Sequence, residues 1–184
     1  MRNKRGAWIL LLFCGWLAAE EFSSEKAIRI DDFLSRVARR RSSGIFLKKA
    51  TFTEEETNSY LNLIYLKKYA PEVVYISLGL KEKNEVNGTM KIKLAEKTYD
   101  AVPSFLRDID VQFSGRVECA NYRMRYLFSK LVINGASFSP EFLDEAFAAA
   151  QVRAKVKKSL FDWFTLLPGL KNVATGDRTI TFFY

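Results

Sequence analysis

Residues 73–94, VVYISLGLKEKNEVNGTMKIKL, decide the fold class of this chain. The first eight residues are rich in β-branched and aromatic side chains and predict a strand, and residues 81–84 supply a turn. After the turn, apolar residues alternate with polar ones, as in an antiparallel strand with one buried face: Val86, Met90, Ile92 and Leu94. Asn87 and Gly88 interrupt the alternation and predict a bulge or a bend. Strands joined by so short a turn pair antiparallel, so the chain contains an antiparallel sheet.

The same alternation returns further along the chain, at residues 109–119. Ala120 and Asn121 are expected to turn the chain into a second long strand, which ends at Asn134 and Gly135. The alternation of this strand changes register near residues 127–128, which predicts either a second bulge or apolar surroundings on both faces of the strand. A last pair of short strands is expected at residues 170–174 and 179–183.

Helical patterns lie on both sides of these strands. Residues 30–38 have apolar side chains at helical spacing. Thr53 followed by Glu56 predicts a capping box at the start of a helix that ends before Pro71. We expect that helix to bury an apolar face: Tyr60, Leu61, Ile64 and Tyr65. Ser139 and Pro140 are expected to begin a further helix.

This order of elements predicts an α+β fold: a twisted antiparallel sheet of long strands, covered on one face by helices, with a C-terminal β-hairpin. Neither a repeat nor a linker divides the chain. Residues 20–184 are therefore expected to form a single domain. Within it, residues 20–44 form an N-terminal helix and residues 45–184 form the sheet-and-helix core.

Residues 1–19 predict a secretory signal peptide. A basic head is followed by an apolar run of 11 residues, then by Ala18 and Ala19 and by the acidic Glu20. The run is shorter than the roughly 20 residues of a membrane-spanning helix, so cleavage is favoured over a retained anchor. Phe13 before Cys14 does not match the small residue that a bacterial lipobox requires. We therefore expect an exported protein of the periplasm or cell envelope.

Composition excludes several kinds of chemistry. The chain has no histidine, and Cys119 is the one cysteine outside the predicted signal peptide. Ser-His-Asp and Cys-His catalysis are therefore excluded, and a zinc site would have to be built from carboxylates. We predict no metal site, no cofactor and no catalytic residue. The chief enzyme alternative is a carboxylate pair, Asp108 and Asp110, two apart on a predicted strand and so on one face.

The chain carries a formal net charge of +8, which falls to +5 without the three basic residues of the signal peptide. A basic excess fits an anionic membrane surface or nucleic acid, and export argues against nucleic acid. Solubility alone would also explain a positive charge of this size. We therefore expect an anionic membrane surface as a partner and no nucleic acid, and the oligomeric state stays open.

Large apolar side chains near the end of the chain follow a basic helix tail, as in a lipid groove. The same side chains could instead complete the core. We predict that they bind a lipid or acyl chain together with residues of the two main helices. The predicted ligand-binding residues are Tyr60, Ile64, Phe142, Phe147, Phe161, Trp163 and Phe164.

Residues 53–61, TEEETNSYL, resemble the T-E-x-E-x-N-x-Y-L segment of small exported bacterial proteins of uncharacterised function. Residues 134–143 and 167–176 continue the resemblance, which covers residues 45–184. That group is in turn distantly similar to bacterial tubular lipid-binding (TULIP-type) proteins. The resemblance implies a long curved sheet wrapped around helices and an apolar channel, and it implies no catalytic residues.

Two functions of different classes follow. The first is a non-catalytic cell-envelope protein that binds a lipid or other hydrophobic ligand between its curved sheet and its helices. The second is a structural or assembly factor of the envelope that acts through protein–protein contacts. A continuous apolar cavity would favour the first.

Overall fold

The computed structural model describes residues 22–39, 47–93, 108–151, 159 and 161–184, with the backbone alone for residues 146–151. The predicted signal peptide, residues 1–19, lies outside these residues. The end of the predicted N-terminal helix, residues 40–44, and the side chain of Phe147 lie outside them as well.

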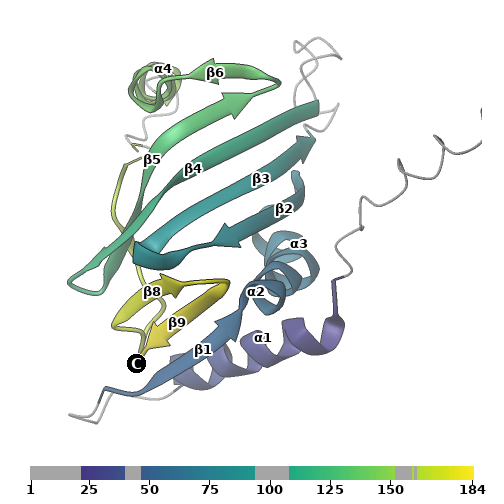
Figure 1. Ribbon diagram of the computed structural model, residues 1–184, viewed down its shortest axis with the longest axis vertical. Coiled ribbons are helices and arrows are strands. Elements are labelled where there is room, and N and C mark those ends of the chain that lie inside the picture. The colour runs from purple at the N-terminus through teal and green to yellow at the C-terminus, as the bar shows by residue number, and fades with distance from the viewer. Residues whose placement is uncertain (1–21, 40–46, 94–107, 152–158, 160) are drawn as a thin grey trace, which may run out of the picture.

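Six strands form one antiparallel sheet (Figure 1). Its order is β2-β3-β4-β5-β6, and a short β7 pairs with another part of β5. The strands are β2 (Val73–Leu80), β3 (Glu85–Lys93), β4 (Asp108–Ala120), β5 (Arg123–Ile133), β6 (Ala136–Phe138) and β7 (Phe164–Thr165). A 3-10 turn, η2 (Glu82–Asn84), joins β2 to β3. The predicted antiparallel sheet of long strands is confirmed.

A second, three-stranded sheet has the order β1-β9-β8. It contains β1 (Lys49–Thr53), β8 (Asn172–Gly176) and β9 (Thr179–Phe183), and β8 and β9 form the predicted C-terminal hairpin. The fold is α+β, as predicted. Its strands are divided between two sheets, and the larger sheet is not closed into a barrel.

One of the two predicted bulges is present. The register of β4 against β5 shifts between Ser114 and Gly115, opposite Phe128, as the change of alternation indicated. The bulge predicted at Asn87 and Gly88 is wrong, because β3 keeps an unbroken register with both neighbours there. A side chain at Gly88 would lie 2.6 Å from the Phe113 ring, so the glycine makes room for that ring.

Helix α1 (Ser24–Arg39) packs into a core beside the three-stranded sheet. Its buried residues recur at helical spacing: Ala27, Ile30, Phe33 and Val37. The Phe33 ring contacts the rings of Phe52, Phe182 and Tyr184 at centroid distances of 5.2–5.8 Å. We call this cluster, with Leu166, Leu170 and Val173, the lower core.

A second helical run begins with the predicted capping box. The Glu56 amide donates to the Thr53 hydroxyl at 3.2 Å, and the Thr53 amide donates to the Glu56 carboxylate at 2.7 Å. The run comprises α2 (Glu54–Tyr60), a π-helical segment η1 (Leu61–Tyr65) and α3 (Leu66–Tyr69). The predicted apolar buried face is wrong. Tyr60, Leu61 and Ile64 are half-buried and Tyr65 is exposed, whereas the buried residues are mostly polar: Glu56, Thr57, Asn58, Ser59 and Leu66.

The reason is that this helical run lies against the open edge of β2 (Figure 1). The side-chain oxygen of Asn58 accepts a hydrogen bond from the Leu78 N–H at 2.8 Å, and its side-chain NH2 group donates one to the Leu78 carbonyl at 3.0 Å. Asn62 does the same for Ile76, and the Glu54 carboxylate accepts from the Leu80 N–H at 2.6 Å. Side chains spaced four apart on the helix thus replace a neighbouring strand and satisfy the edge.

Helix α4 (Pro140–Gln151) lies beside β5, and its first turn is capped by the Ser139 hydroxyl, which accepts from the Phe142 N–H at 3.1 Å. Among the helices of the described residues, none is both long enough and apolar enough to cross a bilayer.

Candidate functional site

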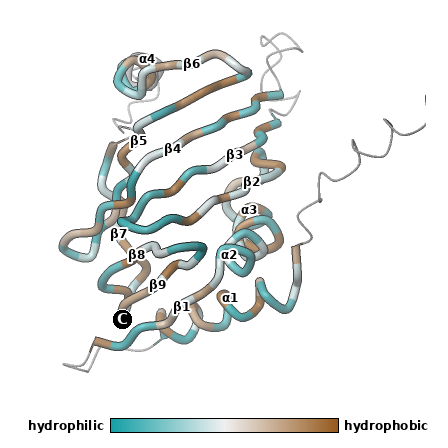
Figure 2. The backbone as a smooth tube through the Cα atoms, in the orientation of Figure 1, coloured by the Kyte–Doolittle hydropathy of each residue, from teal (hydrophilic) through white to brown (hydrophobic). Residues whose placement is uncertain are grey.

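The six-stranded sheet has one apolar and one polar face, because side chains alternate along each strand. Figure 2 shows this alternation along β3 and β4. Residues that lie opposite each other on paired strands point to the same face of the sheet. Together they form rows of side chains that run across the strands. On the apolar face the rows are Ile92 with Ile109; Ile76, Met90, Val111 and Ile133; Leu78, Gly88, Phe113, Leu131 and Phe138; Leu80, Val86, Gly115 and Phe128; and Val117 with Tyr126.

Aromatic rings occupy the middle of the apolar face. Phe113, Tyr126 and Phe128 contact one another edge to face, at centroid distances of 4.7–6.3 Å. Phe161 extends the cluster from Phe128 at 6.5 Å. A side chain at Gly115 would lie 2.8 Å from the Tyr126 ring, so this glycine lets the ring lie on the sheet. We call the four rings the aromatic floor.

The Tyr126 hydroxyl donates to the Val86 carbonyl at 2.6 Å. Burial raises the pKa of Tyr126, so the phenol stays neutral and leaves no charge on the apolar face.

The two ends of the apolar face differ. At the end near the three-stranded sheet, Leu80, Val86 and Val117 are buried, and the half-buried Ile180 of β9 packs against them. Cys119 lies here too, and burial raises the pKa of its thiol, which makes it a poor nucleophile. Towards the opposite end, Val111 and Leu131 are buried within a ring of half-buried residues: Ile76, Met90, Ile92, Ile109 and Ile133.

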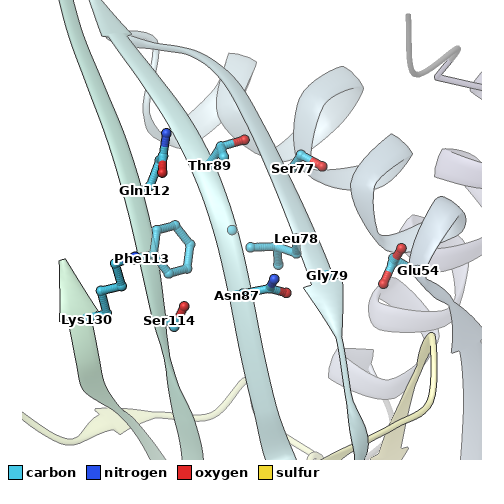
Figure 3. Close-up of a pocket in the computed structure, with 11 residues that line it drawn as sticks. Glu54, Ser77, Leu78, Gly79, Asn87, Thr89, Gln112, Phe113, Ser114 and Lys130 are labelled. Carbon is cyan, nitrogen blue, oxygen red and sulfur yellow. The ribbon is translucent and has the colours of Figure 1, made fainter. Parts of the chain in front are cut away.

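The polar face carries a hollow of about 350 Å³ between β2 and β5 (Figure 3). Its polar groups are hydroxyls, amides and two charged side chains: Glu54, Ser77, Asn87, Thr89, Gln112, Ser114 and Lys130. The Glu54 carboxylate already accepts from Leu80 and lies 3.8 Å from Arg178. An apolar ligand would leave these groups without water, so this face does not suit a lipid chain.

The structure distributes the predicted ligand-binding residues among several places. Phe161 joins the aromatic floor, and Tyr60 packs on the lower core, where burial raises its pKa to about 12. Ile64 lies half-buried in η1. Phe142 is exposed and stacks on Phe138 with ring centroids 6.5 Å apart.

Two further predicted residues lie at the β5–β7 edge. Phe164 is exposed opposite Met124. Trp163 lies under the guanidinium of Arg125, which belongs to the polar face, at 4.6 Å. The predicted set is therefore not one cluster among the described residues.

The aromatic floor contains three residues that were not predicted as ligand-binding: Phe113, Tyr126 and Phe128. A signal was present in the alternation of residues 109–119, and in the two glycines that lie beneath the rings. Which glycine faces which ring depends on the cross-strand register, and the bulge at Gly115 shifts that register.

The alternative carboxylate pair lies on the polar face, in the first residues of β4. Asp108 and Asp110 are both exposed, and Asp110 is 3.9 Å from Lys91. The described residues contain no group of three acidic or cysteine side chains able to hold a metal ion.

Neither a protein-family model, nor a curated protein, nor a solved structure matches this chain.

Proposed function

We propose that this chain binds a lipid or another hydrophobic ligand against the apolar face of its six-stranded sheet, without catalysing a reaction. The observation that supports the proposal is the set of apolar rows that run across β2, β3, β4 and β5. These rows contain no charged side chain, whereas the rows of the opposite face carry most of the sheet's charged and amide groups.

The size of this face suits an acyl chain. At about 3.4 Å per residue, a nine-residue strand such as β3 is roughly 30 Å long, and five strands about 4.8 Å apart span roughly 20 Å. Ligand sites are lined mostly by apolar side chains with a few polar groups, and the side chains of this face have that composition. The aromatic floor offers ring edges and faces to methylene groups, and the flexible Met90 side chain can adapt to the shape of a ligand.

The arrangement of the helices also supports the proposal. An apolar sheet face needs a cover in water, which helices usually supply. Among the described helices, α2, η1 and α3 contact the edge of β2, α1 packs with α2 and the lower core, and α4 contacts β5. Among the described residues, these helices contact mainly β2 and β5 rather than the central strands β3 and β4.

The second candidate function is a structural or assembly factor of the envelope that acts through protein–protein contacts. It is favoured by the large apolar side chains on the outer surface: Tyr69, Val74, Tyr122 and Phe164. Both candidates place the protein in the cell envelope. Intact-mass analysis of exported protein tests this location, with a chain that starts at or near Glu20 as the expected result.

Ligand binding is tested by native mass spectrometry for a co-purified lipid, followed by titration with a fluorescent fatty acid. Met90→Asp places a charge in the apolar row of Ile76 and Val111 and is expected to weaken uptake at least about tenfold. Thr89→Asp is the matched control, because it places the same charge on the polar face of the same strand.

Met90→Trp serves as a second variant if Met90→Asp fails to fold. It fills the site without a charge and is also expected to weaken uptake, while circular dichroism shows a folded protein. Equal uptake by the Met90 and Thr89 variants, or no lipid and no uptake in the wild type, would exclude the carrier function and favour the assembly factor.

A further inference from the structure

The tip of the β4–β5 hairpin and the adjoining β7 form a corner with exposed aromatic side chains. Tyr122 is 61% exposed, Phe164 53% and Trp163 37%. The corner is one unit, because the Leu166 N–H donates to the Tyr122 carbonyl at 2.9 Å and β7 pairs with β5. Figure 1 shows the hairpin tip projecting beyond the ends of β2 and β3. We call it the hairpin corner.

Trp163 is held in a fixed place within this corner. The Arg125 guanidinium lies 4.6 Å from the Trp163 ring centroid, an attractive cation–π contact. Arg125 is in turn bound to the Glu118 carboxylate by two hydrogen bonds of 3.0 and 2.8 Å. The Trp163 indole is thus partly exposed, and the bound Arg125 guanidinium packs on its ring. The indole therefore loses little conformational freedom when it contacts a partner.

Further basic groups surround Trp163. It borders two hollows, one of about 580 Å³ that Lys83 and Arg116 also line, and one of about 480 Å³ that Arg123 lines. Glu118 is paired with Arg116 as well as with Arg125, and the Asp162 carboxylate accepts from the Ser159 N–H. Among the residues that line these two hollows, the cations Lys83, Arg116 and Arg123 outnumber the carboxylate of Glu118.

We propose that the hairpin corner docks on the surface of an anionic lipid bilayer. Tryptophan and tyrosine favour the interface between headgroups and hydrocarbon, where an apolar ring meets water. Guanidinium groups match the geometry of lipid phosphates, and a negatively charged surface attracts clustered basic residues. Because the corner projects, a deformable bilayer can surround it on both faces of the sheet. The inference goes beyond the proposed ligand site and does not depend on it.

The test follows Trp163 directly. Trp8 and Trp16 are the other tryptophans of the chain, so Trp163 is the sole tryptophan both in a chain that starts near Glu20 and in the full chain with W8F/W16F. In either chain, vesicles of phosphatidylcholine and phosphatidylglycerol are expected to shift Trp163 emission to the blue. Brominated lipids in the same vesicles are expected to quench it. Both effects should be much weaker with phosphatidylcholine alone, and should fall in about 1 M NaCl, where screening acts within about 3 Å.

Variants identify the side chains responsible for vesicle binding, which is measured by sedimentation of the protein with the vesicles. Arg123→Gln removes one charge at the corner and is expected to weaken binding about fivefold. Lys91→Gln is the matched control, because it removes the same charge far along the polar face. Trp163→Ala is expected to weaken binding at least about tenfold. The control Tyr69→Ala removes an exposed ring from α3 and should leave binding unchanged. Every variant carries the same residues 1–19, so differences between variants report on the corner.

Three results would overturn the proposal: no quenching of Trp163 by brominated lipid, equal binding to neutral and anionic vesicles, or equal effects of the corner variants and their controls. A blue shift produced by inorganic phosphate alone would also overturn it, and would indicate a free-anion site. Fatty-acid uptake by the Arg123 variant separates this proposal from the ligand site, because that uptake should be unchanged.

Discussion

The two sheets of this protein differ in how helices pack against them. In the lower core, Phe33, Phe52, Leu170 and Val173 are all buried between α1 and the three-stranded sheet. On the six-stranded sheet, the described helices contact mainly the outer strands β2 and β5, and most residues of the apolar face are half-buried. We expect the lower core to supply much of the stability, whereas the apolar face of the large sheet carries the proposed ligand site.

The largest expected effect tests the first half of this comparison. Phe33→Ala removes a ring that contacts three others and is 6% exposed, so it should lower the free energy of unfolding by about 3–5 kcal/mol. Phe161→Ala, at the half-buried edge of the aromatic floor, should cost clearly less. Chemical denaturation of both variants measures the difference. Equal losses would mean that the two sheets contribute alike to stability.

An intermediate effect is expected where the helical run meets the large sheet. Asn58 is fully buried, and its loss leaves the N–H and the carbonyl of Leu78 without their partner. Asn58→Ala should therefore cost about 2–4 kcal/mol. Asn62→Ala should cost less, because Asn62 is only half-buried and water can reach its place. Hydrogen exchange at Leu78 and Ile76 identifies the amides released, and unchanged protection at Leu78 would contradict the edge role of Asn58.

The smallest effect concerns the start of α2. Thr53→Ala removes one half of the capping box and should cost about 1 kcal/mol. Glu54→Ala should cost a similar amount, about 1 kcal/mol, because it takes the acceptor from the Leu80 N–H. Glu55→Ala is the control and should lower the free energy of unfolding least, because the Glu55 carboxylate is bound to the exposed Lys26. Urea denaturation ranks the three, and a larger loss at Glu55 than at Thr53 would be inconsistent with this helix start.

Local patterns predicted most of the elements. The alternation of residues 86–94 and 109–119, the turns between strands, and the Thr53 capping box each depend on neighbours within a few residues, so the sequence suffices for them. The helix after Thr53 was mispredicted on its buried face. Its apolar residues indicated a core contact, but its polar residues face an edge strand whose position depends on residues 20 positions away. The bulge predicted at Gly88 is wrong for the same reason, because the Phe113 ring that occupies the space beside Gly88 belongs to the neighbouring strand.

The sequence by itself determined the fold class, the strand pairs joined by short turns and the division of each strand into a polar and an apolar side, because backbone geometry links these features to the order of residues. Only the tertiary structure decided that β1 joins β9 in a separate sheet, that Asn58 and Asn62 complete the edge of β2, and that Phe113 and Tyr126 lie over glycines. It also decided that Trp163 lies on Arg125 rather than among the rings of the apolar face. These contacts join segments far apart in the chain, and their register and packing follow from the whole sheet rather than from any local pattern.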